Sequence, residues 1–274
     1  MNFMEEERIP GIGHDGYTIT PYPVLRRFAL DSGYLGRRMN TMHGLLEFDD
    51  TEARRLIQAD RARTGESISF TAFLIYCLAR AIEAHRETHA YLDWRNRLVI
   101  YDDVNITMMI EIGSEQGKVA LPRMIYAANR NSVAEIQTDI RSAQKKPMNT
   151  REMRFIRLFL RLPGFIRHLG EEAMMRNPRI FRDYASPVLV SSVGMFIKGG
   201  GWGIPLGDFS LSIFVVGRAE KPGVIESRIE IREYLCLTLS FDHDIIDGAP
   251  AARFTQQFRE FVEMACGLES YKLK

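Results

Sequence analysis

The residues with the clearest chemical potential lie near the end of the sequence, in the segment LTLSFDHDIIDGAPAARF, residues 237–254. A long apolar run ends just before His243. Asp247 and Gly248 follow, and a helical pattern then begins with Pro250 in its first turn. An unperturbed imidazole titrates near pH ~6.5, whereas a thiol titrates near pH ~8.5 and attacks as the thiolate. A histidine held at a strand end can therefore act as a general base on a thiol.

The same segment has a purely structural interpretation. In this interpretation, Asp247 is simply the N-cap of the last helix, and Gly248 is simply a turn residue. A lone histidine at a strand end is more often structural than catalytic. These residues by themselves leave both interpretations open.

The elements that would position His243 are a mixture of strands and helices without strict alternation. This order predicts an α/β fold, a two-layer sandwich with a mixed sheet. Turns are expected at Pro163-Gly164 and at KPG, residues 221–223, and Ser67 or Ser69 is expected to begin the helix near residue 70. We expect strands at 42–49, 97–104, 105–113, 118–126, 186–192, 211–219, 227–233 and 234–243, and helices at 51–63, 70–85, 133–144, 151–162 and 250–266.

The segment SFDHDIIDGAPAARF resembles the HxxxDG signature of the dihydrolipoyl acyltransferase cores of 2-oxo-acid dehydrogenase complexes and of chloramphenicol acetyltransferase. Peptide-synthetase condensation domains share HxxxDG, so the resemblance depends on an ordered set of segments. That set covers roughly residues 25–145 and 187–267. It includes ISFTAFLIYCLARAI, NRLVIYDDVNI, VALPRMIYAANRNSVAEI, VLVSSVGMF and LSIFVVGRAEKP.

The resemblance implies a chloramphenicol acetyltransferase-like fold that assembles as a homotrimer, with the active site between subunits. It implies that His243 is the general base, and that Ser191 donates a hydrogen bond to the tetrahedral oxyanion. Asp247 then holds the geometry of the site. Taken without the resemblance, Ser191 is a serine that closes a strand. The implied substrates are acyl-coenzyme A with coenzyme A or a dihydrolipoyl group as the thiol.

Several features depart from the family pattern. Asp244 stands where the family usually has arginine, next to His243. The substrate preference at the rim of the implied active site is therefore left open. The sequence has no lipoyl domain or Ala/Pro-rich tether, so we expect a lipoyl group only on a separate protein. The polar C-terminal residues GLESYKLK predict that assembly stops at the trimer.

A basic helical insert is predicted at about 145–187, within a catalytic domain that spans residues 25–274. The insert holds ten Lys or Arg against four Asp or Glu, and Arg154, Arg157 and Arg161 form one helical stripe. It can be a flap that packs its apolar side on the domain, or a lid whose arginines attract the phosphates of coenzyme A. A helix at 151–169 that contacts a membrane surface is the third interpretation. The glycine loop KGGGWGIPLG is expected to pack tightly near Ser191, and Trp202 can line the substrate site.

Composition limits the other classes of function. The net charge of +1 gives no field that favours nucleic acid, and no apolar run is long enough to span a membrane. Residues 1–24 predict an irregular arm, and its acidic start, unlike a signal peptide, predicts a cytoplasmic protein. The three cysteines, Cys77, Cys236 and Cys266, do not form a set of metal ligands. We expect them to act as small hydrophobic residues that stay reduced.

Three functions therefore remain in view. The first is a coenzyme A-dependent acyltransferase, favoured by the joint presence of His243, Asp247 and Ser191. The alternative is a non-catalytic trimeric scaffold or regulator derived from such an enzyme, favoured by the missing tether and the insert. Condensation-type amide synthesis is a third, but those modules have a doubled histidine, and here Asp242 precedes His243.

Overall fold

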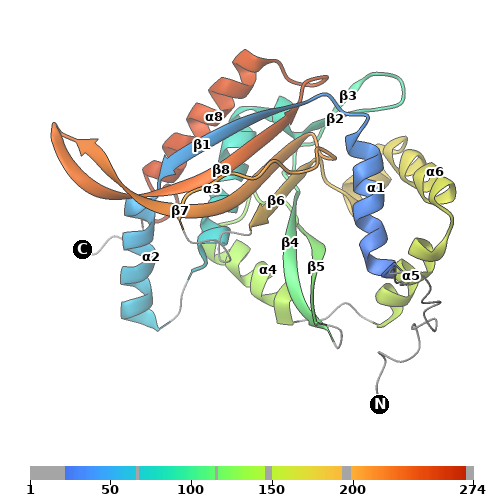
Figure 1. Ribbon diagram of the computed structural model, residues 1–274, viewed down its shortest axis with the longest axis horizontal. Coiled ribbons are helices and arrows are strands. Elements are labelled where there is room, and N and C mark those ends of the chain that lie inside the picture. The colour runs from blue at the N-terminus through green and yellow to red at the C-terminus, as the bar shows by residue number, and fades with distance from the viewer. Residues whose placement is uncertain (1–21, 66–67, 115–116, 146–149, 193–198, 270–274) are drawn as a thin grey trace, which may run out of the picture.

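The computed structural model describes residues 22–65, 68–114, 117–145, 150–192 and 199–269 (Figure 1). Most of the predicted arm at 1–24 lies outside these ranges. The helical segments are η1 Val24–Arg26, α1 Arg27–Gly36, α2 Thr51–Thr64, α3 Phe70–Ala84, η2 Arg86–His89, α4 Val133–Lys145, α5 Thr150–Arg161, α6 Gly164–Met175, α7 Pro178–Tyr184 and α8 Gly248–Glu263. The strands are β1 Thr41–Asp49, β2 Ala90–Leu92, β3 Leu98–Ile100, β4 Ile106–Ser114, β5 Gly117–Ile125, β6 Val188–Ser192, β7 Leu211–Ile225 and β8 Arg228–Asp242.

Six of these strands form one mixed sheet in the order β1-β8-β7-β6-β4-β5. The β4–β6 and β6–β7 pairs are parallel, and the other pairs are antiparallel. Helices α3, α4 and α8 lie together against the sheet, and their apolar sides form the core with it (Figure 1). The predicted α/β two-layer architecture with a mixed sheet is confirmed.

Helix α3 is the centre of the helical layer because it is apolar on several sides. Phe73, Leu78 and Ile82 are fully buried. The hydroxyl of Ser69 accepts a hydrogen bond from the Ala72 amide at 3.2 Å and caps the helix. Of the two serines proposed to begin this helix, Ser69 is the one that does so.

The hairpin formed by β7 and β8 differs from the prediction. Pro222 and Gly223 lie inside strand β7, and the turn falls at Glu226 and Ser227, which have φ of 47° and 65°. This part of β7 lies beyond the residues that pair with β6, so its ladder is with β8, where Pro222 lies opposite Ile231. Proline is tolerated where a strand has such a free edge. The two strands expected at 227–233 and 234–243 are correspondingly one continuous strand, β8.

The predicted insert forms α5, α6 and α7, of which α5 and α6 lie beside α1 at one end of the sheet (Figure 1). Arg27 donates a hydrogen bond to the carbonyl of Leu160 at 2.8 Å. Arg167 makes a two-pronged ion pair with Asp31, with N–O distances of 2.8 and 2.6 Å, and both side chains are buried. The insert is therefore fixed to α1, a helix that no pattern in the sequence predicts.

Candidate active site

His243 follows the last residue of β8 directly, where the chain turns toward α8. Its amide donates a hydrogen bond to the carbonyl of Asn40 at 2.8 Å, which ties this turn to the residue before β1. The amides of Ile245 and Ile246 both bond to the carbonyl of Asp242 at 3.1 Å. The backbone is thus held on both sides while the imidazole remains 53% exposed and open to a substrate.

Packing below the turn fixes the direction in which α8 leaves it. The rings of Phe241 and Phe254 meet edge to face with centroids 5.7 Å apart, and Phe254 is fully buried. Phe258 and Val262 extend the same buried side of α8, as the sequence predicts, and Phe261 is partly buried. The step from strand to helix around His243 is therefore rigid.

Asp247 lies at the N-cap position of α8, but its carboxylate makes no capping hydrogen bond. Its Oδ1 is 3.7 Å from Nδ1 of His243, and the side chain is 84% exposed. This distance is longer than a hydrogen bond and suits an ion pair with a protonated imidazole. Asp247 and His243 are thus brought together.

The residues on either side of His243 form a small carboxylate network. Asp242 is buried, and its Oδ1 accepts a hydrogen bond from the Asp244 amide at 3.1 Å. Burial raises the pKa of the Asp242 carboxyl above its ordinary value. The Asp244 Oδ1 accepts a hydrogen bond from Nδ2 of Asn40 at 2.9 Å. Asn40 is therefore a positioning residue of this site, bound through its carbonyl and its amide group, and no motif in the sequence marks it.

Ser191 lies on β6, half-buried, and a single chain does not bring it to His243. Ser191 pairs with Phe214, which pairs with Thr238 on β8. His243 comes five residues after Thr238, about 16 Å farther along the strand direction at ~3.3 Å per residue. A direct contact between the hydroxyl and the imidazole therefore requires two chains.

Within the described residues of the glycine loop, Gly200, Gly203 and Gly207 pack tightly, whereas a Cβ at Gly199 or Gly201 would meet open space. A Cβ at Gly203 would lie 2.6 Å from the ring of Phe214, the strand partner of Ser191. Trp202 donates a hydrogen bond from Nε1 to the carbonyl of Leu46 at 2.9 Å and remains partly exposed. Val193 to Lys198 lie outside the described residues, so the proposed lining role of Trp202 stays a prediction.

The best-defined cavities of the single chain do not surround the candidate catalytic residues. One, of about 300 Å³, lies between α1 and α6 and is lined by residues that include Tyr34, Arg37 and His168. The other, of about 250 Å³, lies between α2 and the start of α3 and is lined by residues that include Arg54 and Arg61. Neither cavity is lined by His243.

The cysteines serve packing and not the candidate chemistry. Cys77 and Cys236 are buried, Cys266 is partly buried, and all three are unpaired. Burial raises the pKa of the Cys77 thiol well above its ordinary value, which opposes thiolate formation. Across the described ranges, no group of His, Cys, Asp and Glu side chains could hold a metal ion, and no helix has the length and apolar content needed to cross a bilayer.

A protein-family model matches most of the chain. The family model described as 2-oxoacid dehydrogenases acyltransferase (catalytic domain) matches residues 41–153 and 186–268. The unmatched stretch between them falls within the predicted insert, whose boundaries at 145–187 stay a prediction. The two matched parts carry β1 to α4 and β6 to α8, which include every strand of the main sheet.

Two curated relatives are also described as acyltransferase components of 2-oxo-acid dehydrogenase complexes. The chain is 38% identical over 81 residues to the dihydrolipoyllysine-residue acetyltransferase component of the pyruvate dehydrogenase complex of Zymomonas mobilis, covering 29% of this chain and 18% of the relative. It is 22% identical over 203 residues to the dihydrolipoyllysine-residue succinyltransferase component of the 2-oxoglutarate dehydrogenase complex of Buchnera aphidicola, covering 74% of this chain and 42% of the relative. The chain thus spans less than half the length of either relative.

Solved structures share the fold. A probable dihydrolipoamide acetyltransferase from Listeria monocytogenes superposes with a TM-score of 0.68 at 20% identity, covering 91% of this chain and 96% of that chain. A chloramphenicol acetyltransferase superposes with a TM-score of 0.50 at 14% identity, covering 88% of this chain and 98% of that chain. The chloramphenicol acetyltransferase-like fold class predicted from the sequence is confirmed.

Proposed function

The chain belongs to the family of 2-oxoacid dehydrogenase acyltransferase catalytic domains, and from that premise we propose that it transfers an acyl group between a thioester and a thiol. Coenzyme A is one of the two thiols. The other is a dihydrolipoyl group carried by a separate protein, or another small acceptor. The unpaired cysteines suit a reducing compartment, so the cytoplasm is the proposed location.

The observation that carries this proposal is the placement of His243. Its backbone is fixed by the hydrogen bond to Asn40, while its imidazole is half exposed. A neutral imidazole with a free ring nitrogen can take the proton of a thiol, a step that contributes roughly 10²–10⁴-fold in rate. Cys77 and Cys236 are buried, so their thiols do not compete as nucleophiles.

In the proposed reaction, His243 removes the proton of the incoming thiol as its sulfur attacks the thioester carbonyl carbon. The carbonyl π bond opens, and negative charge develops on oxygen, where the hydroxyl of Ser191 donates a hydrogen bond. Collapse of this intermediate re-forms the carbonyl and breaks the original carbon–sulfur bond. The departing thiolate then takes the proton back from His243, so the enzyme ends as it began. A fixed donor to the oxyanion is worth about 3 kcal/mol in such sites.

The site is proposed to lie between the subunits of a homotrimer. Ser191 stands about 16 Å from His243 along the strand direction of its own chain, by the spacing of ~3.3 Å per residue. A second chain is therefore needed to supply the hydroxyl. The cavities between α1 and α6 and beside α2 leave His243 outside, which agrees with a site that one chain does not complete.

Asp247 and Asp244 are proposed to act on geometry and not as proton carriers. Asp247 lies 3.7 Å from Nδ1 of His243 and can stabilise the imidazolium formed during transfer. Asp244 is bonded to Asn40, so its carboxylate secures the turn. We propose that, at the position where the family usually has arginine, this carboxylate disfavours acceptors that carry a negative charge near the reacting sulfur.

A thiol-release assay tests the proposal. Acyl-coenzyme A thioesters of increasing chain length are supplied with dihydrolipoamide as acceptor, and free coenzyme A is measured. We expect His243→Ala to lower the rate by about 10²–10⁴-fold. The control His43→Gln removes a histidine bonded to Ser240 on a neighbouring strand and should retain activity. Equal rates for wild type and His243→Ala would contradict catalysis and favour the trimeric scaffold.

A further inference from the structure

The outward side of the α5–α6 pair exposes large apolar side chains next to arginines. We call this surface the outer face. Four apolar side chains on it are more than half exposed, which is unusual for helices that face water. They are Phe155 at 70%, Leu158 at 63%, Phe165 at 73% and Leu169 at 61%.

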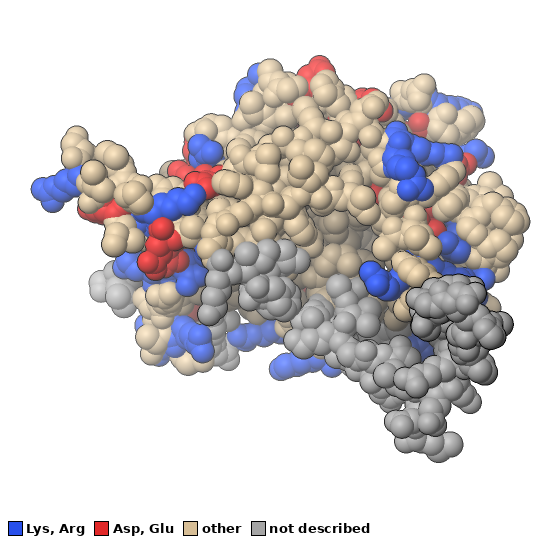
Figure 2. Space-filling view, in the orientation of Figure 1, with Lys and Arg blue, Asp and Glu red and all other residues tan. Residues whose placement is uncertain are grey.

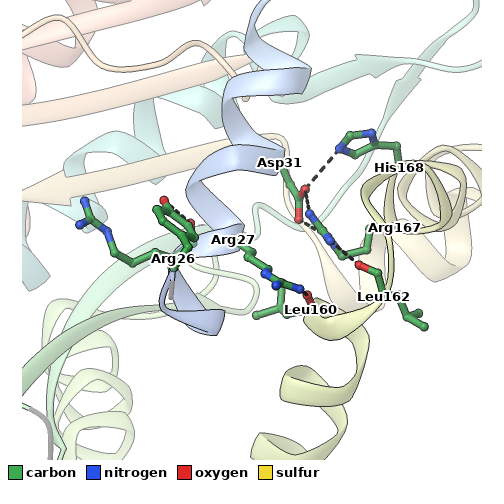
Figure 3. A network of polar contacts seen from close by, with 8 residues as sticks. Arg26, Arg27, Asp31, Leu160, Leu162, Arg167 and His168 are labelled. Atoms are coloured by element: carbon green, nitrogen blue, oxygen red, sulfur yellow. Dashed lines mark hydrogen bonds and ion pairs between the residues drawn. The ribbon is translucent and has the colours of Figure 1, made fainter. Parts of the chain in front are cut away.

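The opposite side of the same helices holds the pair in place. Leu160 is fully buried, and its carbonyl accepts the hydrogen bond from Arg27 (Figure 3). Arg167 turns inward, where it binds Asp31 and donates to the carbonyl of Leu162 at 2.5 Å (Figure 3). These inward contacts fix the helices without any help from the outer face, which is therefore free to serve another purpose.

The charge of the outer face has one sign. Arg154, Arg157 and Arg161 are exposed at helical spacing, and none forms an ion pair within the described part of the chain. The segment 154–169 contains no aspartate or glutamate; the acidic residues of α5 and α6 flank it, and of these Glu172 pairs with Arg38 of the segment after α1. Figure 2 shows Lys and Arg side chains over the region of α1 and α6 at the right of the view, with a few Asp and Glu side chains among them.

We propose that the outer face binds an anionic lipid surface, with its apolar side chains in the interface and its arginines at the headgroups. An interfacial helix combines an exposed apolar side with basic residues in this way. Each basic residue near an anionic surface raises the binding constant for that surface about fivefold. The pair lies on the surface and does not cross it, since each helix spans 12 residues.

Other occupants fit the observations less well. Two copies meeting through this face would bring their arginine stripes together, which is unfavourable. A single coenzyme A needs a pocket, but the nearest cavity is lined by Asp31, Arg167 and His168 on the inner side of the helices. A hydrocarbon layer with anionic headgroups satisfies the apolar and the basic side chains at the same time.

Vesicle co-sedimentation of the full chain tests this proposal. The vesicles are pure phosphatidylcholine, or phosphatidylcholine with phosphatidylglycerol. We expect sedimentation with the anionic vesicles alone, weakened at least tenfold when sodium chloride rises from about 0.1 to about 0.5 M. Sedimentation with neither vesicle, or equal sedimentation with both, would overturn the proposal.

Variants locate the binding surface. Leu158→Asp combined with Phe165→Asp should lower binding to the anionic vesicles at least tenfold, and Arg154→Gln, Arg157→Gln and Arg161→Gln together should lower it about a hundredfold. Ile229→Asp is the matched control, because Ile229 is 79% exposed on the distant β7–β8 hairpin, and it should bind like wild type. Retained binding by the outer-face variants would contradict the assignment.

Two further measurements keep the result specific. Circular dichroism melts should agree for all variants, because the replaced side chains are exposed. Sedimentation velocity without lipid should give the same assembly for wild type and Leu158→Asp/Phe165→Asp; a smaller assembly for the variant would assign the face to subunit contact and overturn the proposal. Binding to polyglutamate without binding to anionic vesicles would instead assign it to an acidic protein. None of these readouts depends on acyl transfer.

Discussion

The carbonyl of Asn40 accepts the amide hydrogen of His243 at 2.8 Å, joining residues that lie about two hundred positions apart in the chain. Asn40 follows α1 and precedes β1, so the bond couples the N-terminal helix to the turn that carries the candidate base. Because α1 is also held by Arg167 through Asp31, the insert, α1 and the turn that carries the candidate base form one connected structure.

Asp247→Ala tests whether this residue has the proposed role in catalysis or only a role in capping α8. Its carboxylate makes no capping hydrogen bond, so we expect the free energy of unfolding to change by less than about 0.5 kcal/mol. The transfer rate should fall by at least about tenfold, because the imidazolium formed during transfer loses the neighbouring carboxylate that stabilises its charge. Urea denaturation and the thiol-release assay give the two values.

Ser69→Ala is the matched control for that variant. Ser69 does cap its helix, through the Ala72 amide, so its loss should cost about 1 kcal/mol of stability and leave the transfer rate intact. An Asp247→Ala variant that loses stability but keeps full activity would show that Asp247 is only a cap.

Arg167→Ala should be the most destabilising change in the insert. It removes both guanidinium contacts from the buried carboxylate of Asp31 and leaves it only His168, at 3.2 Å; losing the charged partner of a buried ion pair typically costs about 3–5 kcal/mol. Arg167→Lys should recover only part of the loss, because an ammonium group cannot reproduce the two-pronged contact. The exposed Arg157→Ala serves as control in urea denaturation and should stay within about 0.5 kcal/mol of wild type; comparable losses for both would refute a structural role for the ion pair.

Glu171 should make stability depend on pH. Burial, and then the charge of Asp31, raise the pKa of its carboxyl from 4.5 to about 7. The folded chain therefore holds this proton more tightly than the unfolded chain, so the stabilisation is present below pH 4.5 and is lost as pH rises through about 7. After discounting for partial exposure, we expect a loss of about 1–2 kcal/mol.

Glu171→Gln removes that titration and isolates it from the other groups. The variant should match wild type near pH ~5 and be more stable at pH ~8, as urea denaturation across this range would show. Parallel stability curves for the two proteins would mean that Glu171 titrates normally.

Gly207→Ala should disturb the link between the glycine loop and the start of β1. The added Cβ would overlap the side-chain oxygen of Thr41, the residue after Asn40. We expect a loss of about 1–3 kcal/mol from this overpacking, together with a lower transfer rate. Adding Thr41→Ala should restore part of the stability, and a double-mutant cycle measures the coupling. Strictly additive losses would show that the two residues do not press on one another.

The element that carries the candidate base was predictable, because its signals are local. A long apolar run ending in His243, then Asp247-Gly248 and an apolar helical stripe, specify a strand, a turn and a helix in that order. Phe254 and Phe258 face the core as that stripe requires. Ser69, a capping residue just ahead of an apolar run, is predictable for the same reason.

The remaining parts depend on neighbours that a local pattern does not reveal. Pro222 and Gly223 have the composition of a turn, yet they extend a strand, because Gly223 allows Arg232 and Tyr234 to approach closely from β8. Asn40 and Asp31 look like ordinary polar residues until the fold places His243 and Arg167 beside them. Whether Ser191 meets an imidazole depends on a second chain, which no sequence pattern of one chain determines.

The central claim is that the imidazole and the hydroxyl come from different subunits, and mixed assemblies test it most directly. His243→Ala and Ser191→Ala are produced together with different affinity tags, and particles that carry both tags are isolated. In a mixed trimer, one of the three interfaces pairs an intact histidine with an intact serine, so we predict roughly one third of wild-type activity. Each variant alone should fall by at least about 10²-fold. Mixed particles no more active than the two single variants would contradict the claim.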